Sequence, residues 1–136
     1  MNDPHPPIGG VHEAALYVAD LDRAERFWRD LGLPLVARSE GRHVFFRVGR
    51  DVLLLFDAAA TSRPGGTVPP HGAAGPVHVA FDVPGLDALG AWRRRLTAAG
   101  VEVEAEVEWP SGGRSLYFRD PDGNSLEFIT RGSWGF

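Results

Sequence analysis

Hydrophobic positions along the chain form two runs of elements in the same order. In the first run, alternation and helical spacing predict a strand, a helix beginning after Asp20 and three strands. Their ranges are 11–18, 21–31, 33–38, 43–48 and 52–57. The second run predicts the same order at 77–83, 86–99, 101–108, 114–119 and 125–130. Residues 58–76 are rich in Ala, Gly and Pro and predict a linker.

The two runs form an internal repeat. Leu16 matches Phe81 at an offset of 65 residues, and Gly32 matches Gly100 at an offset of 68. A module of about 65 residues buries little surface by itself, so the two modules are expected to share a core. The predicted organisation is one domain over 1–136, with module 1 at about 11–57 and module 2 at about 77–130.

Composition excludes several kinds of chemistry. The chain has no Cys, which removes disulfides, thiolate nucleophiles and Cys-ligated zinc. All 14 basic residues are Arg, so Schiff-base chemistry on a lysine is also excluded. A net charge of −4 argues against a nucleic-acid partner. No apolar run of about 18 residues and no leader-like start is present, so we expect a cytoplasmic protein without a membrane partner.

Strand alternation brings three ligand-type side chains to the faces that point away from the helices. Glu13 begins the first strand, His78 begins the equivalent strand of module 2, and Glu127 lies on the last strand. Two carboxylates and an imidazole suit a divalent cation such as Mn²⁺, Fe²⁺, Ni²⁺ or Zn²⁺. Solvated strand-end charges and a hydrogen-bonded histidine explain the same pattern, so alternation leaves both interpretations open.

Three segments resemble the vicinal oxygen chelate superfamily, which includes glyoxalases, bleomycin-resistance proteins, extradiol dioxygenases and fosfomycin-resistance enzymes. They are EAALYVADLDRAERFWRDLGL, PVHVAFDV and RSLYFRDPDGNSLEF, of which the last is the most specific. The resemblance implies an α+β fold of two βαβββ modules, whose curved mixed sheets form a cup around a metal site. It also implies a homodimer, in which the cup is completed within one chain or across two.

Carried over by position, the superfamily's metal ligands fall on Glu13, His78 and Glu127. Two departures matter. The first ligand is more often His than Glu. The fourth, a Glu in glyoxalases, is Leu54 here, the position that the repeat matches to Glu127. Because that carboxylate is a candidate base for the glyoxalase reaction, Leu54 puts this reaction in doubt.

The main hypothesis is a glyoxalase-like enzyme that binds two neighbouring oxygens of a small, oxygen-rich substrate through its metal ion, for isomerase, lyase or transferase chemistry. Glu127 or Glu13 is the expected base, and Tyr117 or Tyr17 is the expected proton donor. The residues expected to contact the substrate are Tyr17, Leu54, Phe56, Ser115 and Trp109.

Two alternatives remain open. A metal-free, drug-sequestering protein would use the apolar cup positions, because ligand pockets are mostly apolar. A fosfomycin-resistance-like, epoxide-opening transferase would use Ser115 and Tyr117, which stand twelve and ten residues before Glu127. Two other histidines are expected outside the site: His43 in solvent, and His71 in a loop that could close over a pocket.

Overall fold

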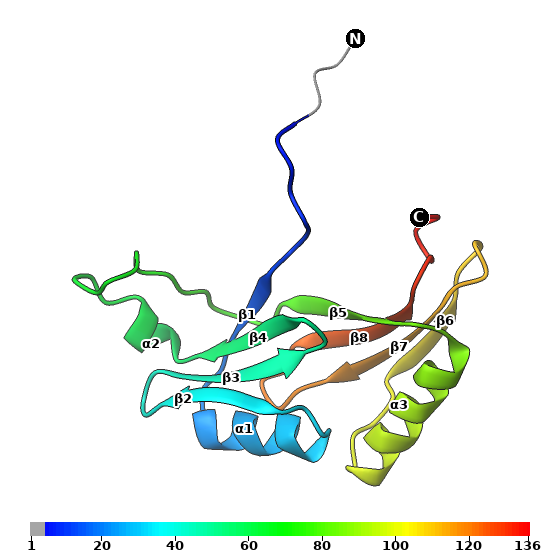
Figure 1. Ribbon diagram of the computed structural model, residues 1–136. Helices are drawn as coiled ribbons and strands as arrows, with labels where there is room; N and C mark the ends of the chain where they lie inside the picture. Colours follow the sequence, from blue (N-terminus) through cyan, green and yellow to red (C-terminus); the bar gives the residue numbers. More distant parts are fainter. Residues whose placement is uncertain (1–4) are drawn as a thin grey trace.

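The computed structural model describes residues 5–136, which form two four-stranded mixed sheets with a long helix of each module on one side (Figure 1). Module 1 contains β1 (Glu13–Tyr17), α1 (Leu21–Asp30), β2 (Leu35–Ser39), β3 (His43–Val48) and β4 (Asp51–Phe56). Module 2 contains β5 (His78–Val83), α3 (Leu86–Ala98), β6 (Ala105–Glu108), β7 (Arg114–Arg119) and β8 (Ser125–Thr130). A short helix, α2 (Ala58–Thr61), lies in the connection between them.

Both sheets have the same topology. Their strand orders are β1-β4-β3-β2 and β5-β8-β7-β6, in which the first pair is parallel and the others are antiparallel. The predicted α+β class with two βαβββ modules is therefore confirmed. Figure 1 shows the segments 5–12 and 131–136 leaving from the side of the sheets opposite the helices. We call this helix-free side of each sheet its open face.

Some boundaries differ from the sequence prediction. β1 and β2 each begin two residues later than expected, and β6 begins at Ala105 because the ladder with β7 starts at its pair with Tyr117. Val101 and Val103, predicted as strand, instead pack against the core. The predicted linker contains α2 because the Asp57 side chain accepts a hydrogen bond from the Ala60 backbone N–H and caps a turn of alanines.

Helix α1 begins and ends where its sequence predicts. The Asp20 side chain accepts a hydrogen bond from the backbone N–H of Arg23 at 3.0 Å, which satisfies one free donor of the first turn. Gly32 follows the helix with a φ of +93°, a conformation that side chains rarely adopt. Ala24 and Trp28 form the buried stripe between these ends.

One hydrophobic cluster contains buried side chains of both modules. Trp28 of α1 is 1% exposed, and its ring lies 5.8 Å from that of Phe81 on β5 and 6.5 Å from that of Phe118 on β7, centroid to centroid. Phe27 also stacks on Phe118. Helix α1 therefore packs against the sheet of the other module as well as its own, and the two modules share one core.

The turn between β7 and β8 is fixed by two buried polar side chains. One carboxylate oxygen of Asp120 accepts hydrogen bonds from the backbone N–H groups of Asp122 and Asn124, and the other accepts from the Asn124 side-chain amide. Asn124 in turn accepts a hydrogen bond from the Val77 backbone N–H at 2.9 Å. Because Val77 immediately precedes β5, this turn sets the alignment of β5 with β8.

Replacing Asp120 by Ala is expected to lower the free energy of unfolding by about 2–4 kcal/mol, because buried donors lose their acceptor. Urea denaturation measures the loss. The exposed Glu102 offers a control, and Glu102→Ala should change stability by less than about 0.5 kcal/mol. Equal stability of the two variants would show that the turn does not depend on the carboxylate.

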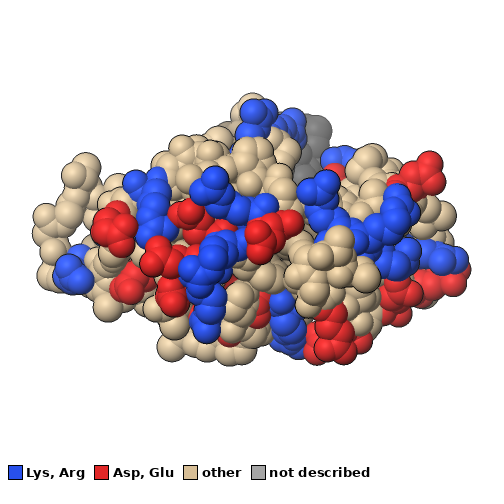
Figure 2. Space-filling model, turned by 90° about the horizontal axis from the view of Figure 1, so that it is seen from below, with Lys and Arg blue, Asp and Glu red and all other residues tan. Residues whose placement is uncertain are grey.

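The helix side of the molecule carries a mixture of acidic and basic side chains, without a large patch of either sign (Figure 2). Part of it is an ion-pair network in which Arg38 of β2 reaches Glu25 at 2.6 Å and Asp22 at 2.7 Å on α1. Among residues 5–136, no helix combines the length and the apolar composition that crossing a membrane requires.

Candidate functional site

Strand register arranges the open face of module 1 in three rows of side chains. Glu13 lies beside Val52, Ala15 beside Leu54, and Tyr17 beside Phe56. On the other side of β4, Phe45 pairs with Leu54 and His43 pairs with Phe56. Successive rows are two residues apart, or about 7 Å along the strands.

Module 2 repeats these rows with different side chains. His78 takes the place of Glu13, Glu127 that of Leu54, Tyr117 that of Phe45 and Ser115 that of His43. The sequence analysis proposed the first two equivalences, and the register confirms them. The chemically active groups therefore gather on module 2, whereas the same rows of module 1 are mostly apolar.

His78 and Glu127 form a directly contacting pair. The Nε2 atom of His78 lies 3.2 Å from Oε1 of Glu127, whose side chain is only 6% exposed. The other ring nitrogen, Nδ1, lies 2.9 Å from the Ser125 carbonyl oxygen. Since a carbonyl only accepts, Nδ1 carries a proton, and Nε2 directs either a lone pair or a second proton toward the carboxylate. If the imidazole is neutral, its Nε2 lone pair faces the carboxylate oxygen, and a cation bound by both atoms would compensate their repulsion. An imidazole nitrogen and a carboxylate oxygen are ligands that suit a divalent metal ion.

Two further side chains form a chain of hydrogen bonds that ends on Glu127. The Ser115 hydroxyl donates to Oε2 of Glu127 at 2.5 Å, and the indole Nε1–H of Trp109 donates to the Ser115 oxygen at 2.8 Å. Ser115 is 1% exposed. Both residues were predicted to contact substrate; the structure places them in a chain of hydrogen bonds that orients the carboxylate, and their contact with substrate stays a prediction.

Tyr117 stands beside Glu127 in the same row. Burial raises the pKa of the Tyr117 hydroxyl, and the negative charge of Glu127 raises it further. The phenol therefore keeps its proton at neutral pH and remains a hydrogen-bond donor next to the carboxylate. Its ring also stacks on that of His78, with centroids 6.2 Å apart.

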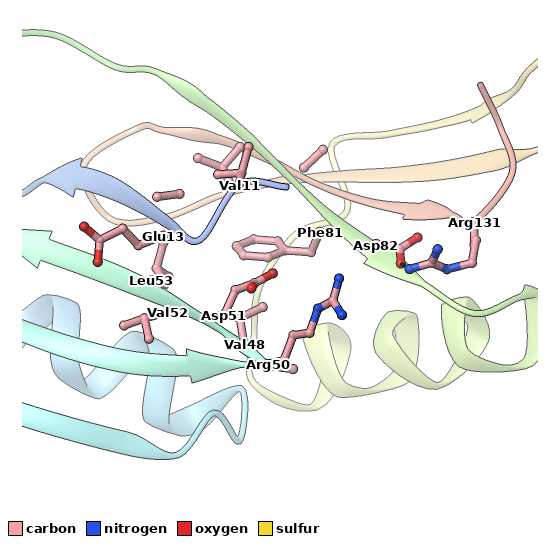
Figure 3. Close-up of a pocket in the computed structure, with 14 residues that line it drawn as sticks. Val11, Glu13, Val48, Arg50, Asp51, Val52, Leu53, Phe81, Asp82 and Arg131 are labelled. Atoms are coloured by element: carbon pink, nitrogen blue, oxygen red, sulfur yellow. Dashed lines mark hydrogen bonds and ion pairs between the residues drawn. The ribbon is translucent and has the colours of Figure 1, made fainter. Parts of the chain in front are cut away.

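Glu13 does not join this pair within the single chain. Within residues 5–136, no three His, Asp or Glu side chains lie close enough together to hold one ion. Glu13 instead lines a hollow at the seam between the modules, together with Asp51, Phe81 and the ion pair of Asp82 with Arg131 (Figure 3). The predicted three-ligand set is thus divided, with two ligands on module 2 and one on module 1.

A second hollow covers the rows of module 1. Its wall includes Tyr17, Phe45, Leu54 and Phe56, and it extends from Glu13 to the segment 68–71. The ring of His71 lies 4.7 Å from that of Phe56, and its Nδ1 is hydrogen bonded to the Tyr17 hydroxyl at 2.6 Å. The loop that contains His71 therefore folds back onto the open face.

The sequence analysis placed His43 in solvent, and this was wrong. Its ring stacks on Phe45 with centroids 4.0 Å apart, and its buried Nδ1 has no hydrogen-bond partner. Burial lowers the pKa of His43, and the positive charge of Arg42 lowers it further. The alternation that puts His43 on the open face also puts Phe45 beside it, so this aromatic neighbour was the signal in the sequence that His43 is shielded from solvent.

Comparisons with known proteins agree with this architecture. Residues 10–128 match the sequence model of the Glyoxalase/Bleomycin resistance protein/Dioxygenase superfamily. The chain belongs to this superfamily. The family resemblance predicted from the motifs is therefore confirmed. No match was found among curated protein sequences.

Solved structures of the superfamily superpose on the whole fold. A lactoylglutathione lyase from Agrobacterium tumefaciens is 42% identical, with a TM-score of 0.90 over 96% of this chain and 100% of its own. A glyoxalase/bleomycin resistance protein/dioxygenase from Nocardioides is 25% identical, with a TM-score of 0.71 over 93% of this chain and 85% of its own. A similarly described protein from Alicyclobacillus acidocaldarius, at 20% identity and a TM-score of 0.65, shares the fold.

Membership of the superfamily carries a general expectation. Its proteins act on small molecules, and many of them bind a divalent metal ion. The side chains on the rows decide which of its chemistries a given member performs. In this protein the open-face side chains are polar on module 2 and mostly apolar on module 1.

Proposed function

We propose that the protein is a divalent-metal-dependent, glyoxalase-like enzyme that acts on a small, oxygen-rich substrate. Its metal ligands are Glu13, His78 and Glu127. The observation that supports the metal most directly is the orientation of His78: the Ser125 carbonyl fixes Nδ1, so Nε2 faces a buried carboxylate oxygen 3.2 Å away.

The bound ion would polarise two neighbouring oxygens of the substrate. The chain's own residues would do the rest. Ser115 and Trp109 hold one oxygen of Glu127 in place, which leaves its other oxygen on the side of His78. Tyr117, beside Glu127, would donate a hydrogen bond to negative charge that develops on a substrate oxygen. Glu127 or Glu13 would take up the proton that the substrate loses.

The site would be completed by a second copy of the chain, which brings Glu13 of its module 1 to the pair on module 2. Two observations support this arrangement. Glu13 is not grouped with the pair inside one chain. Both terminal segments also leave on the open-face side with large apolar groups exposed, among them Trp134 at 83% and Phe136 at 99% (Figure 1). Such exposure is typical of segments that a partner covers.

Mixing two inactive variants tests the ligands and the dimer together. Glu13→Ala and His78→Ala are each expected to bind almost no Mn²⁺ in equilibrium dialysis. After the two chains are unfolded and refolded together, each heterodimer would contain one intact site and one doubly altered site. About a quarter of the wild-type Mn²⁺ binding should return, because random pairing makes half of the dimers heterodimers.

Two results would contradict this proposal. Wild-type Mn²⁺ affinity in either single variant would remove that residue from the ligand set. If the refolded mixture still binds almost no Mn²⁺, the whole site lies within one chain. The exposed His12 supplies the matched control, since His12→Ala should bind Mn²⁺ as the wild type does.

Glyoxalase activity is the first reaction to assay, because the similar Agrobacterium structure is described as a lactoylglutathione lyase. Leu54 argues for a different substrate. It occupies the position of Glu127 in the repeated register and leaves that position without a carboxylate. We therefore expect weak turnover of the hemithioacetal of methylglyoxal and glutathione, and more rapid turnover of another oxygen-rich molecule.

A metal-free, drug-sequestering protein is the second candidate, and the aromatic hollow of module 1 favours it. In that case the contact between His78 and Glu127 would be an imidazolium–carboxylate ion pair. Calorimetry with and without EDTA separates the two functions. Ligand binding that is unchanged by EDTA favours sequestration, and binding that requires added Mn²⁺ favours the enzyme.

A further inference from the structure

The hollow on module 1 has a composition suited to one class of chemical group. Five aromatic side chains line it, four on the strands and one on the loop, and Leu54 lies among them. They are Tyr17, His43, Phe45, Phe56 and His71. Among the residues that line it, Arg42 is the only arginine and Glu13 the only acidic side chain. A flat apolar group is well matched to such a surface.

His71 completes this wall from outside the sheet. Its backbone N–H donates to the Thr61 carbonyl at 2.9 Å, which anchors it at the end of α2. Its side chain is hydrogen bonded to Tyr17, 54 residues earlier in the chain, and lies edge-on to Phe56. Two contacts thus fix a loop residue as a rigid part of the cavity, so its ring loses little freedom when a ligand binds.

Distance along the strands relates the hollow to the proposed metal ligands. The row of Leu54 and Phe45 lies about 7 Å from the row of Glu13, and the row of Tyr17 and Phe56 lies about 14 Å from it. A phenyl ring attached to one of the two adjacent carbons that carry the neighbouring oxygens would therefore cover Leu54 and reach toward His71. A glutathione moiety would bring several charged groups to a wall with one fixed cation.

We propose that this hollow is a subsite for an aromatic group, so that the substrate is an aryl-substituted compound with two neighbouring oxygens. His71 and Phe56 would determine this specificity. The inference rests on the proposed function, because the metal ion is what would hold the oxygens at the Glu13 end. It goes further in naming the chemical class of the group next to those oxygens and the residues that select it.

Two keto acids test the subsite, because they carry the same pair of oxygens. Phenylglyoxylate has a phenyl group where pyruvate has a methyl group. With Mn²⁺-loaded protein, calorimetry should show that phenylglyoxylate binds about tenfold more tightly or better, since the ring buries more apolar surface. Trimethylpyruvate, which is apolar but not flat, should bind between the two.

Substitutions assign the preference to the hollow. His71→Ala and Phe56→Ala should each weaken the binding of phenylglyoxylate more than that of pyruvate, so that the ratio of the two affinities falls toward one. His71→Ala is the safer variant, since His71 lies outside the buried core and its loss should not disturb folding. His12→Ala is again the matched control and should keep the full ratio.

The outcomes separate the subsite from the proposed function. Equal affinity for phenylglyoxylate and pyruvate, or a preference that both variants retain, overturns the subsite. Binding of both acids that is the same in Mn²⁺ and in EDTA overturns the metal-dependent function, while the affinity ratio still reports on the hollow. A direct readout is the NMR signal of the His71 ring protons, which should shift with the aryl acid and not with pyruvate.

Discussion

Replacing Trp28 by Ala is expected to lower the free energy of unfolding by about 3–5 kcal/mol, the usual cost of removing a large buried aromatic side chain. Trp28 is 1% exposed and contacts both Phe81 and Phe118 of module 2. Its removal therefore leaves a cavity at the junction of the two modules. Since a domain of this size is stable by only about 5–15 kcal/mol, the variant should be close to unfolded at 37 °C.

Urea denaturation of this variant needs a control that removes an exposed apolar side chain. Leu86 on α3 is 59% exposed, so Leu86→Ala should leave the stability within about 0.5 kcal/mol of the wild type. The unfolding transition of Trp28→Ala should remain single, because one core serves both modules. Two separate transitions would show that the modules fold independently.

Glu127→Gln is expected to weaken Mn²⁺ binding by more than about 100-fold. The amide keeps the size of the side chain and can still accept the hydrogen bond from Ser115, but it lacks the negative charge that a divalent ion requires. Ser115→Ala should have a smaller effect, about tenfold, because it removes only the group that orients the carboxylate. Titration followed by electron paramagnetic resonance of free Mn²⁺ measures both.

Glu106→Gln is the matched control for this series. Glu106 lies on β6 with a side chain that is 54% exposed and paired with Arg93, so its substitution should not alter Mn²⁺ affinity. A Glu127→Gln protein that binds Mn²⁺ as tightly as the wild type would remove Glu127 from the ligand set. Unchanged circular dichroism spectra would confirm that the variants differ in binding and not in folding.

The equivalence of strand positions in the two modules was the most predictable feature of the molecule. Side chains alternate strictly along a strand, so the internal repeat was enough to equate Glu13 with His78 and Leu54 with Glu127. The start of α1 at Asp20 and the turn at 120–124 were equally accessible, because each depends on hydrogen bonds between residues close in sequence. Periodicity also gave the order of the elements and their repeat, whereas the α+β fold of two curved sheets was what the resemblance to the superfamily implied.

Contacts made by loops were not predictable in the same way. Tyr17 meets His71 across 54 residues, through a Gly- and Pro-rich segment without hydrophobic periodicity. Trp109 reaches Ser115 from the end of a strand, and neither alternation nor spacing indicated that the two together hold Glu127. His43 is a different case, because its aromatic neighbours Phe45 and Phe56 lie on β3 and β4 at positions that the register sets.

The two sheets match position for position, yet most matched pairs of open-face side chains differ. Selection can therefore act on the two halves separately. Exchanging Phe45 or His43 alters the shape offered to an organic molecule and leaves the carboxylate–imidazole half intact, and the reverse holds for Tyr117 or Ser115. A duplicated ancestor of this kind could diversify its ligands through one copy while the other copy kept the older chemistry.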